Sequence, residues 1–298
     1  MNPLRKIKEG ENCIMAGSLL FFVLFFLGFQ QSFALSVDST FLPQKQKNIV
    51  FGSGINHSSL RDYGTSPLLY SGNMPMLQLG YEQRSAKAIF QFNLNAWYGN
   101  YQRKVFENPF KMQVMGMELR ANYLHRLSKF SSGSKQWYVG AAFIHQLGIR
   151  NAEHFQNSGF SVDNISHLGP QVLWQKFLQQ KPREKKIGKF VFRRPERNFL
   201  LQAGIRLPVI SSFHRPGYVF IANGTKEEYK VFDQYQFSYL SFRGLFLSTS
   251  ITRLMRNGNG FRVSYDWSMV STGNKLPNRF EMANHFVQAS LLFKINAH

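Results

Sequence analysis

The chain has 298 residues and a formal net charge of +20, with 36 Lys and Arg residues against 16 Asp and Glu residues. Aromatic residues make up 15% of the chain, yet the mean hydropathy is only -0.26, so apolar residues must be interleaved with polar ones. Such interleaving argues against a bundle of membrane helices and favours alternating strands. The basic balance would suit a nucleic-acid partner, but the N-terminus indicates export, and an exported chain rarely meets nucleic acid.

The N-terminus has the composition of a secretory signal peptide. Basic residues precede an apolar run over residues 16–29, and small residues ending at Ala34 occupy the two positions that a signal peptidase reads. We therefore expect a cleaved signal peptide over residues 1–34 and a mature domain over residues 35–298. An uncleaved anchor is the alternative. The chain's one cysteine, Cys13, would be lost on cleavage, leaving a mature chain without thiols.

Ten segments after the signal alternate between apolar and polar side chains, as half-buried strands do. They lie at residues 49–56, 76–82, 88–101, 112–125, 137–146, 167–177, 199–210, 237–254, 261–270 and 286–295. No stretch among them approaches 18 apolar residues, so only strands could span a membrane. The pattern predicts an all-β fold: a single transmembrane, antiparallel, up-and-down β-barrel of about ten strands.

The connections between these segments alternate in length. Those after the odd-numbered segments are mostly long, at residues 58–73, 103–111, 147–166, 211–236 and 271–285, whereas most of the others are short. Long loops outside and tight turns in the periplasm are typical of membrane barrels. The connection after residue 177 breaks this rule, because it is long and carries the basic cluster Lys181 to Arg197. It could contain a further hairpin, which would make twelve strands.

The two faces of the segments predict two environments. The apolar face is expected to meet lipid, with Phe90, Phe92, Leu94, Met115, Met117, Leu119, Val263, Trp267, Leu291 and Phe293 as its representatives. The opposite face is polar and is expected to line a narrow lumen, where a paired charge network would form from Glu82, Glu118, Arg120, Arg206, Arg262 and Asp266. We interpret this network as structural filling of the barrel. A path for ions or solutes is the alternative.

The last segment, HFVQASLLFKINAH, places Val287, Leu291 and Ile295 on its outer face. It is similar to the closing strands of bacterial outer-membrane barrels, although the chain continues to His298. The mature chain as a whole resembles outer-membrane β-barrels of the kind common in Bacteroidota. This resemblance implies an outer-membrane location, surrounding lipid and lipopolysaccharide, and insertion by the barrel assembly machinery. The spread of basic residues suits anionic surfaces such as phosphorylated glycolipid.

Candidate catalytic residues are few. Outer-membrane lipid hydrolases use a Ser nucleophile and a His base, and the nearest approximations are His57 with Ser58, and His154 with Ser158. Neither pair has the His-x-Ser-Asn spacing that sends both side chains from one face of a strand. A protease of the omptin type would need acidic pairs and an Asp-His pair, and no motif connects the available residues, which are Asp62, Asp233, His57 and His214.

We therefore predict a barrel without enzymatic activity, with a narrow charged lumen and long extracellular loops that bind a ligand or serve the cell envelope. A phospholipase or lipid A deacylase and a narrow solute channel are the alternatives. No Cys/His metal spacing exists after the signal, and we expect neither a metal nor another cofactor.

Overall fold

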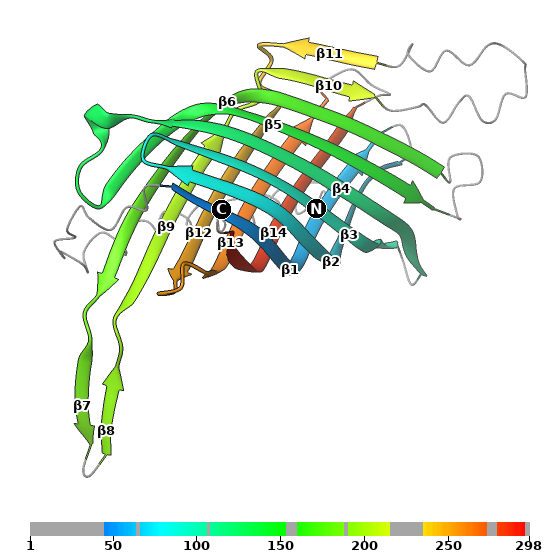
Figure 1. The fold of residues 1–298 in the computed structure, drawn as a ribbon. Coiled ribbons are helices and arrows are strands. Elements are labelled where there is room, and N and C mark those ends of the chain that lie inside the picture. Colours follow the sequence, from blue (N-terminus) through cyan, green and yellow to red (C-terminus); the bar gives the residue numbers. More distant parts are fainter. Residues whose placement is uncertain are drawn as a thin grey trace, which may run out of the picture. The chain divides into compact units, whose positions relative to one another are not determined.

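The alternating segments form antiparallel strands in the computed structural model (Figure 1). It describes residues 45–63, 66–105, 108–152, 160–187, 190–214, 235–272 and 279–295. Ten strands build the barrel wall: β1 (Lys45–Asp62), β2 (Ser66–Ser85), β3 (Ala88–Val105), β4 (Asn108–Arg126), β5 (Lys135–Asn151), β6 (Phe160–Gln180), β9 (Arg197–Arg206), β12 (Gly244–Leu254), β13 (Gly260–Ser271) and β14 (Phe280–Ile295). A 3₁₀ turn, Ser128–Phe130, lies between β4 and β5.

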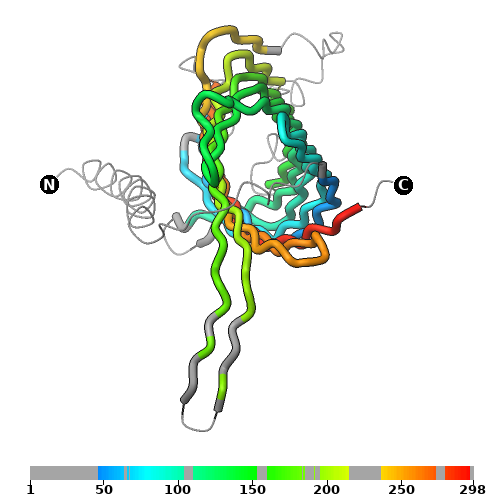
Figure 2. Tube along the Cα trace, turned by 60° about the vertical axis from the view of Figure 1, so that its left-hand side comes forward, coloured from blue at the N-terminus to red at the C-terminus, as the bar shows by residue number. Residues whose placement is uncertain are grey.

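The wall closes on itself (Figure 2). Strand β1 pairs with β2 on one side and with β14 on the other, and β9 pairs with both β12 and β6. Closure leaves no free sheet edge along these ten strands, as a barrel in lipid requires. The all-β class and the antiparallel ten-stranded barrel predicted from the sequence are confirmed. The signal peptide over residues 1–34 lies outside the described residues and stays a prediction.

The twelve-strand alternative is wrong for the barrel. The basic connection does contain a hairpin, β7 (Arg183–Ile187) with β8 (Phe190–Arg194), but these strands pair only with each other, as a separate two-stranded sheet. The hairpin follows the point where Gln180 pairs with Arg197. This point is at the end of the barrel where Lys47 of β1 also faces Ile295 of β14. We call it the turn end, and we call the opposite end the loop end.

Two of the predicted strands are interrupted. After β9, residues 207–209 form a bulge, and β10 (Ile210–His214) then resumes pairing with β6. Pro208 cannot donate a backbone hydrogen bond, and the missing Cβ of Gly169 leaves room for the carbonyl of Leu207. The predicted strand at 237–254 is likewise divided into β11 (Tyr235–Tyr239) and β12. Between them, Leu240 and Phe242 have positive φ values of 52° and 45°.

Several predicted long loops are wrong in extent. Strand β1 continues to Asp62 and β2 begins at Ser66, while β3 ends at Val105 and β4 begins at Asn108. Much of the expected loop at 147–166 is paired strand as well. A membrane needs only about 9–11 residues of a tilted strand, and β2 has 20. The strands therefore extend beyond the apolar band, and their polar outer residues at the loop end hid this extension from the alternation pattern.

The outer surface carries an apolar band of the height that a transmembrane barrel needs. On β1, Ile49, Phe51 and Ile55 are 43%, 57% and 54% exposed, and Lys47 and His57 flank them on the same face. From Lys47 to His57 the strand advances about 34 Å, or roughly 26 Å along the axis at a tilt of about 40°. The apolar band of outer-membrane barrels is about 25 Å tall. All ten predicted lipid-facing residues lie on this outer face.

The interior is not polar throughout, contrary to the expectation from the sequence. A cluster of buried apolar side chains fills much of the lumen between its middle and the loop end: Leu60, Tyr70, Met74, Met76, Trp97, Tyr101, Met112, Val114, Ile144, Ala152, Ile165, Phe213, Phe246, Val270, Phe280 and Phe286. A smaller cluster, Ile89, Leu124, Tyr138 and Leu173, lies toward the turn end. Several strands are thus apolar on both faces over part of their length.

Candidate functional site

Three groups of buried charges connect opposite parts of the wall through the lumen. At the loop end, the guanidinium of Arg150 on β5 lies 2.9 Å from a carboxylate oxygen of Asp62 on β1 and 2.8 Å from one of Asp163 on β6. All three side chains are at most 8% exposed. Charge-assisted pairs of this kind are strong and directional. The guanidinium also lies 5.6 Å from the ring centre of Phe280, which anchors the group in the apolar cluster.

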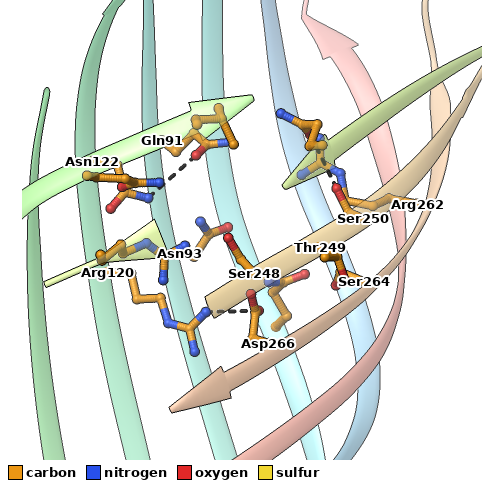
Figure 3. A pocket seen from close by; sticks show the side chains of 15 residues that line it. Gln91, Asn93, Arg120, Asn122, Ser248, Thr249, Ser250, Arg262, Ser264 and Asp266 are labelled. Carbon is orange, nitrogen blue, oxygen red and sulfur yellow. Dashed lines mark hydrogen bonds and ion pairs between the residues drawn. The ribbon is translucent and has the colours of Figure 1, made fainter. Parts of the chain in front are cut away.

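The middle group spans the full width of the barrel. Arg120 on β4 pairs with Glu118 on the same strand and, at 2.9 Å, with Asp266 on β13. Strands β4 and β13 are five positions apart in the ring of ten, so this ion pair joins opposite walls (Figure 3). Glu118 also accepts hydrogen bonds from Asn95 and Gln146.

The third group lies nearer the turn end. Glu82 on β2 pairs with Arg84 and, at 2.9 Å, with Arg262 on β13. Arg84 then donates to Gln175 on β6 at 3.0 Å and to Gln202 on β9 at 3.2 Å. Because each charge has a partner and further hydrogen bonds, the group avoids the cost of an isolated buried ion.

A polar cavity of about 70 Å³ lies within the lumen, beside the middle and third groups. The side chains around it are mostly amides, hydroxyls and guanidinium groups (Figure 3). Three arginines, Arg120, Arg206 and Arg262, line it together with one carboxylate, that of Asp266. The site is a polar chamber beside the ion pairs that cross the lumen, and the apolar cluster fills much of the lumen toward the loop end.

All six of the charged residues predicted for the lumen lie inside the barrel, and five of them take part in ion pairs. The exception is Arg206, which forms no ion pair with any described residue. Sequence reasoning missed four further members of the network: Asp62, Arg84, Arg150 and Asp163. The alternation of side chains indicated that these residues face inward, but each lies beyond the predicted end of its strand.

The sequence-predicted catalytic residues are not brought together. Ser58 faces the lumen, where its hydroxyl lies 2.8 Å from that of Tyr101, whereas His57 faces outward and its Nδ1 lies 2.7 Å from Asn73 Oδ1. Adjacent strand residues point to opposite faces, so this pair cannot share a substrate. The other pair, His154 and Ser158, lies outside the described residues.

The protease candidates are scattered in the same way. Asp62 faces the lumen within the buried group around Arg150, whereas His214 is the last residue of β10 and lies opposite Asn164 of β6 in the register. Asp233 lies outside the described residues. Among the residues with described positions, no group of three or more His, Cys, Asp or Glu side chains could hold a metal ion, and no helix is long and apolar enough to cross a bilayer.

One Ser-His contact that the sequence did not indicate lies on the outer face. His145 on β5 and Ser166 on β6 are directly opposite in the register, and Nδ1 of the histidine lies 2.9 Å from the serine Oγ. The ring of Phe143 stacks on that of His145 at 6.4 Å. Within the described part of the chain, no third side chain hydrogen-bonds to this histidine. The two residues therefore form a dyad without an orienting partner.

No protein-family model and no curated protein sequence matches the chain. Solved structures with a similar course of the chain are outer-membrane β-barrels. They include Ail of Yersinia pestis in complex with the heparin analogue sucrose octasulfate, at 8% identity and a TM-score of 0.33, covering 84% of this chain and all of that one. The translocator domain of the autotransporter NalP from Neisseria meningitidis has 9% identity and a TM-score of 0.35, with 96% and 98% covered.

The Pseudomonas putida toluene transporter TodX is also similar, at 6% identity and a TM-score of 0.29, with 87% of this chain and 92% of that chain covered. At these scores the similarities carry no ligand, transported compound or partner over to this chain.

Proposed function

We propose that the chain is an integral outer-membrane β-barrel whose lumen is closed to solutes and whose role is exerted through the surfaces at its two ends. The buried ion pair between Arg120 and Asp266 carries this proposal, because it joins opposite walls of the barrel at 2.9 Å. The groups around Arg150 and Glu82 cross the lumen at other heights. An open aqueous pore would require all three groups to separate.

The outer surface supports the membrane location. Its apolar band is flanked by polar residues on both sides and matches the thickness of an outer membrane. In this arrangement lipid and lipopolysaccharide surround the band, and the barrel assembly machinery inserts the chain. The turn end, where β1 begins and β14 ends, faces the periplasm. The Bacteroidota affiliation and the binding role of the loops are parts of the same proposal, based on the sequence pattern.

Planar-bilayer recording tests the closed lumen. The refolded mature barrel should show no steady conductance in sodium chloride, while an open porin in the same detergent and lipid conducts. Arg120→Ala should be recorded beside the exposed-arginine control Arg253→Ala, since only the first removes a bridge across the lumen. A stable, large conductance in the unmodified protein would contradict the proposal.

Lipid hydrolysis is a second candidate function, favoured by the outward contact of His145 with Ser166. A serine hydroxyl within hydrogen-bond reach of a histidine is the minimal arrangement for nucleophilic catalysis. Nδ1, rather than Nε2, faces the serine here. Mixed micelles of phospholipid or lipid A should release fatty acid with the unmodified protein and not with Ser166→Ala. The matched control is Ser59→Ala, at another outward position. Equal release, or none, would eliminate this candidate.

A further inference from the structure

We propose that the lumen cavity is a binding site for one small monovalent anion, held by Arg206. This side chain is only 7% exposed and lines the cavity. Its Nε has no hydrogen-bond partner, and no carboxylate among the described residues forms an ion pair with it. An isolated buried cation is costly, and the usual remedy is a counter-charge.

The neighbouring carboxylates are already committed. Asp266 and Glu118 both pair with Arg120, and Glu82 pairs with both Arg84 and Arg262. Together with Arg84, the three arginines that line the cavity face three carboxylates, those of Glu82, Glu118 and Asp266, so these seven side chains have a balance of one positive charge. That balance is the charge of Arg206, so a single negative charge would neutralise the chamber.

The cavity also supplies neutral donors and limits the size of the ligand. Hydroxyl-bearing residues, Ser248, Ser250 and Ser264, line it together with several amides. Its volume of about 70 Å³ holds a few water-sized particles, at about 10–15 Å³ each. The amide oxygen of Gln171, directly opposite Arg206 in the β6–β9 register, lacks a hydrogen-bond partner as well. A water molecule accompanying the anion would satisfy it.

Halide ions and small carboxylates share the required chemistry, which is one negative charge in a small volume. The small volume of the cavity favours such anions over larger ones. Gluconate, a bulky monovalent carboxylate, therefore serves as the reference anion that should not enter. In the experiment, bromide represents the halide ions and formate represents the small carboxylates.

Thermal unfolding of the refolded barrel in detergent tests the site. At constant ionic strength, replacement of sodium gluconate by sodium bromide should raise the Tm of the unmodified protein and leave that of Arg206→Gln unchanged. In gluconate alone, Arg206→Gln should unfold at the same temperature as the unmodified protein or higher, because it removes an uncompensated charge. Arg253→Gln, at an exposed arginine, should behave like the unmodified protein.

A saturating rise with bromide alone would assign a halide site, and a rise with formate as well would assign one that accepts carboxylates. Parallel responses of the unmodified protein and Arg206→Gln, or no response of either, would overturn the proposal. Crystals of the unmodified protein in sodium bromide give a second measurement that needs no variant. An anomalous peak beside the Arg206 guanidinium is expected, and water alone at that position would overturn the proposal. Neither measurement depends on whether the barrel conducts.

Discussion

Replacement of Glu82 by Gln tests whether the charge groups inside the lumen are truly desolvated. The change keeps the size and shape of the side chain and removes one negative charge. Glu82 is 2% exposed and faces two arginines, Arg84 and Arg262, whose side chains are 11% and 12% exposed. Glu82→Gln therefore leaves two guanidinium groups in the same buried region without a counter-charge.

The expected magnitude follows from what remains after the change. Removing one partner of a buried ion pair costs about 3–5 kcal/mol, because the other charge stays buried and unpaired. Arg84 keeps its hydrogen bonds to Gln175 and Gln202, and Arg262 keeps that to Thr252 at 3.0 Å. Because these bonds remain, we expect the loss of unfolding free energy to lie near the lower end of that range, at about 3 kcal/mol.

The chain offers a matched control in Glu281. It also faces two arginines, Arg61 and Arg279, but these three side chains are 26–34% exposed. Exposed pairs contribute only about 0–1 kcal/mol, so Glu281→Gln should lower the unfolding free energy by no more than that. Reversible urea unfolding in lipid vesicles, followed by far-UV circular dichroism, measures both losses under one condition.

A double-mutant cycle isolates the interaction itself. Glu82→Gln combined with Arg262→Gln should cost less than the sum of the two single changes, because the second change removes one of the charges left unpaired by the first. If Glu82→Gln lowers the unfolding free energy no more than Glu281→Gln does, water reaches the charges around Glu82 freely. The closed lumen would then lose its main physical support.

Two further predictions concern the membrane placement. Leu94→Arg, in the middle of the apolar band, should lower the unfolding free energy in vesicles by about 2–4 kcal/mol. Gln102→Arg, on the same face but beyond the band, should lower it by only about 0–1 kcal/mol. Equal losses would show that the band is misplaced. Asn151→Cys, at the loop end, should react with a membrane-impermeant maleimide on intact cells, and Ala86→Cys, at the turn end, only after the outer membrane is permeabilised. The reverse labelling pattern would show that the barrel has the opposite orientation in the outer membrane.

The sequence alone determined the class of fold and the face of each strand. Alternation with a period of two is a local property, because each strand residue points to the opposite side from its neighbours. The segment over residues 88–101 illustrates this: Gln91, Asn93 and Asn95 face the lumen while Phe90 and Phe92 face outward. The number of strands in the barrel could be counted in the same way, since each strand has its own alternating segment.

The ends of the strands could not be read from the sequence. At the loop end the outer residues become polar because they leave the apolar band, as His57 and Arg61 do on β1, yet the backbone continues to pair up to Asp62. Polarity on the outer face therefore marks the edge of the membrane and not the end of the strand. Arg150 and Asp163 also lie on paired strand, in a segment that had been expected to be a loop.

Only the tertiary structure decided which charges are partners and which part of the lumen is apolar. Arg120 and Asp266 are 146 residues apart in the chain and meet because β4 and β13 stand opposite each other in the closed ring. Closure also brings Trp97 against Phe286, with ring centres 5.6 Å apart. Both residues lie on the lumen-facing side of their strands, which the sequence pattern had predicted to be polar. Arg206 has the same inward parity as its paired neighbours. Its lack of a partner depends on distances across the lumen, which no pattern along one strand contains.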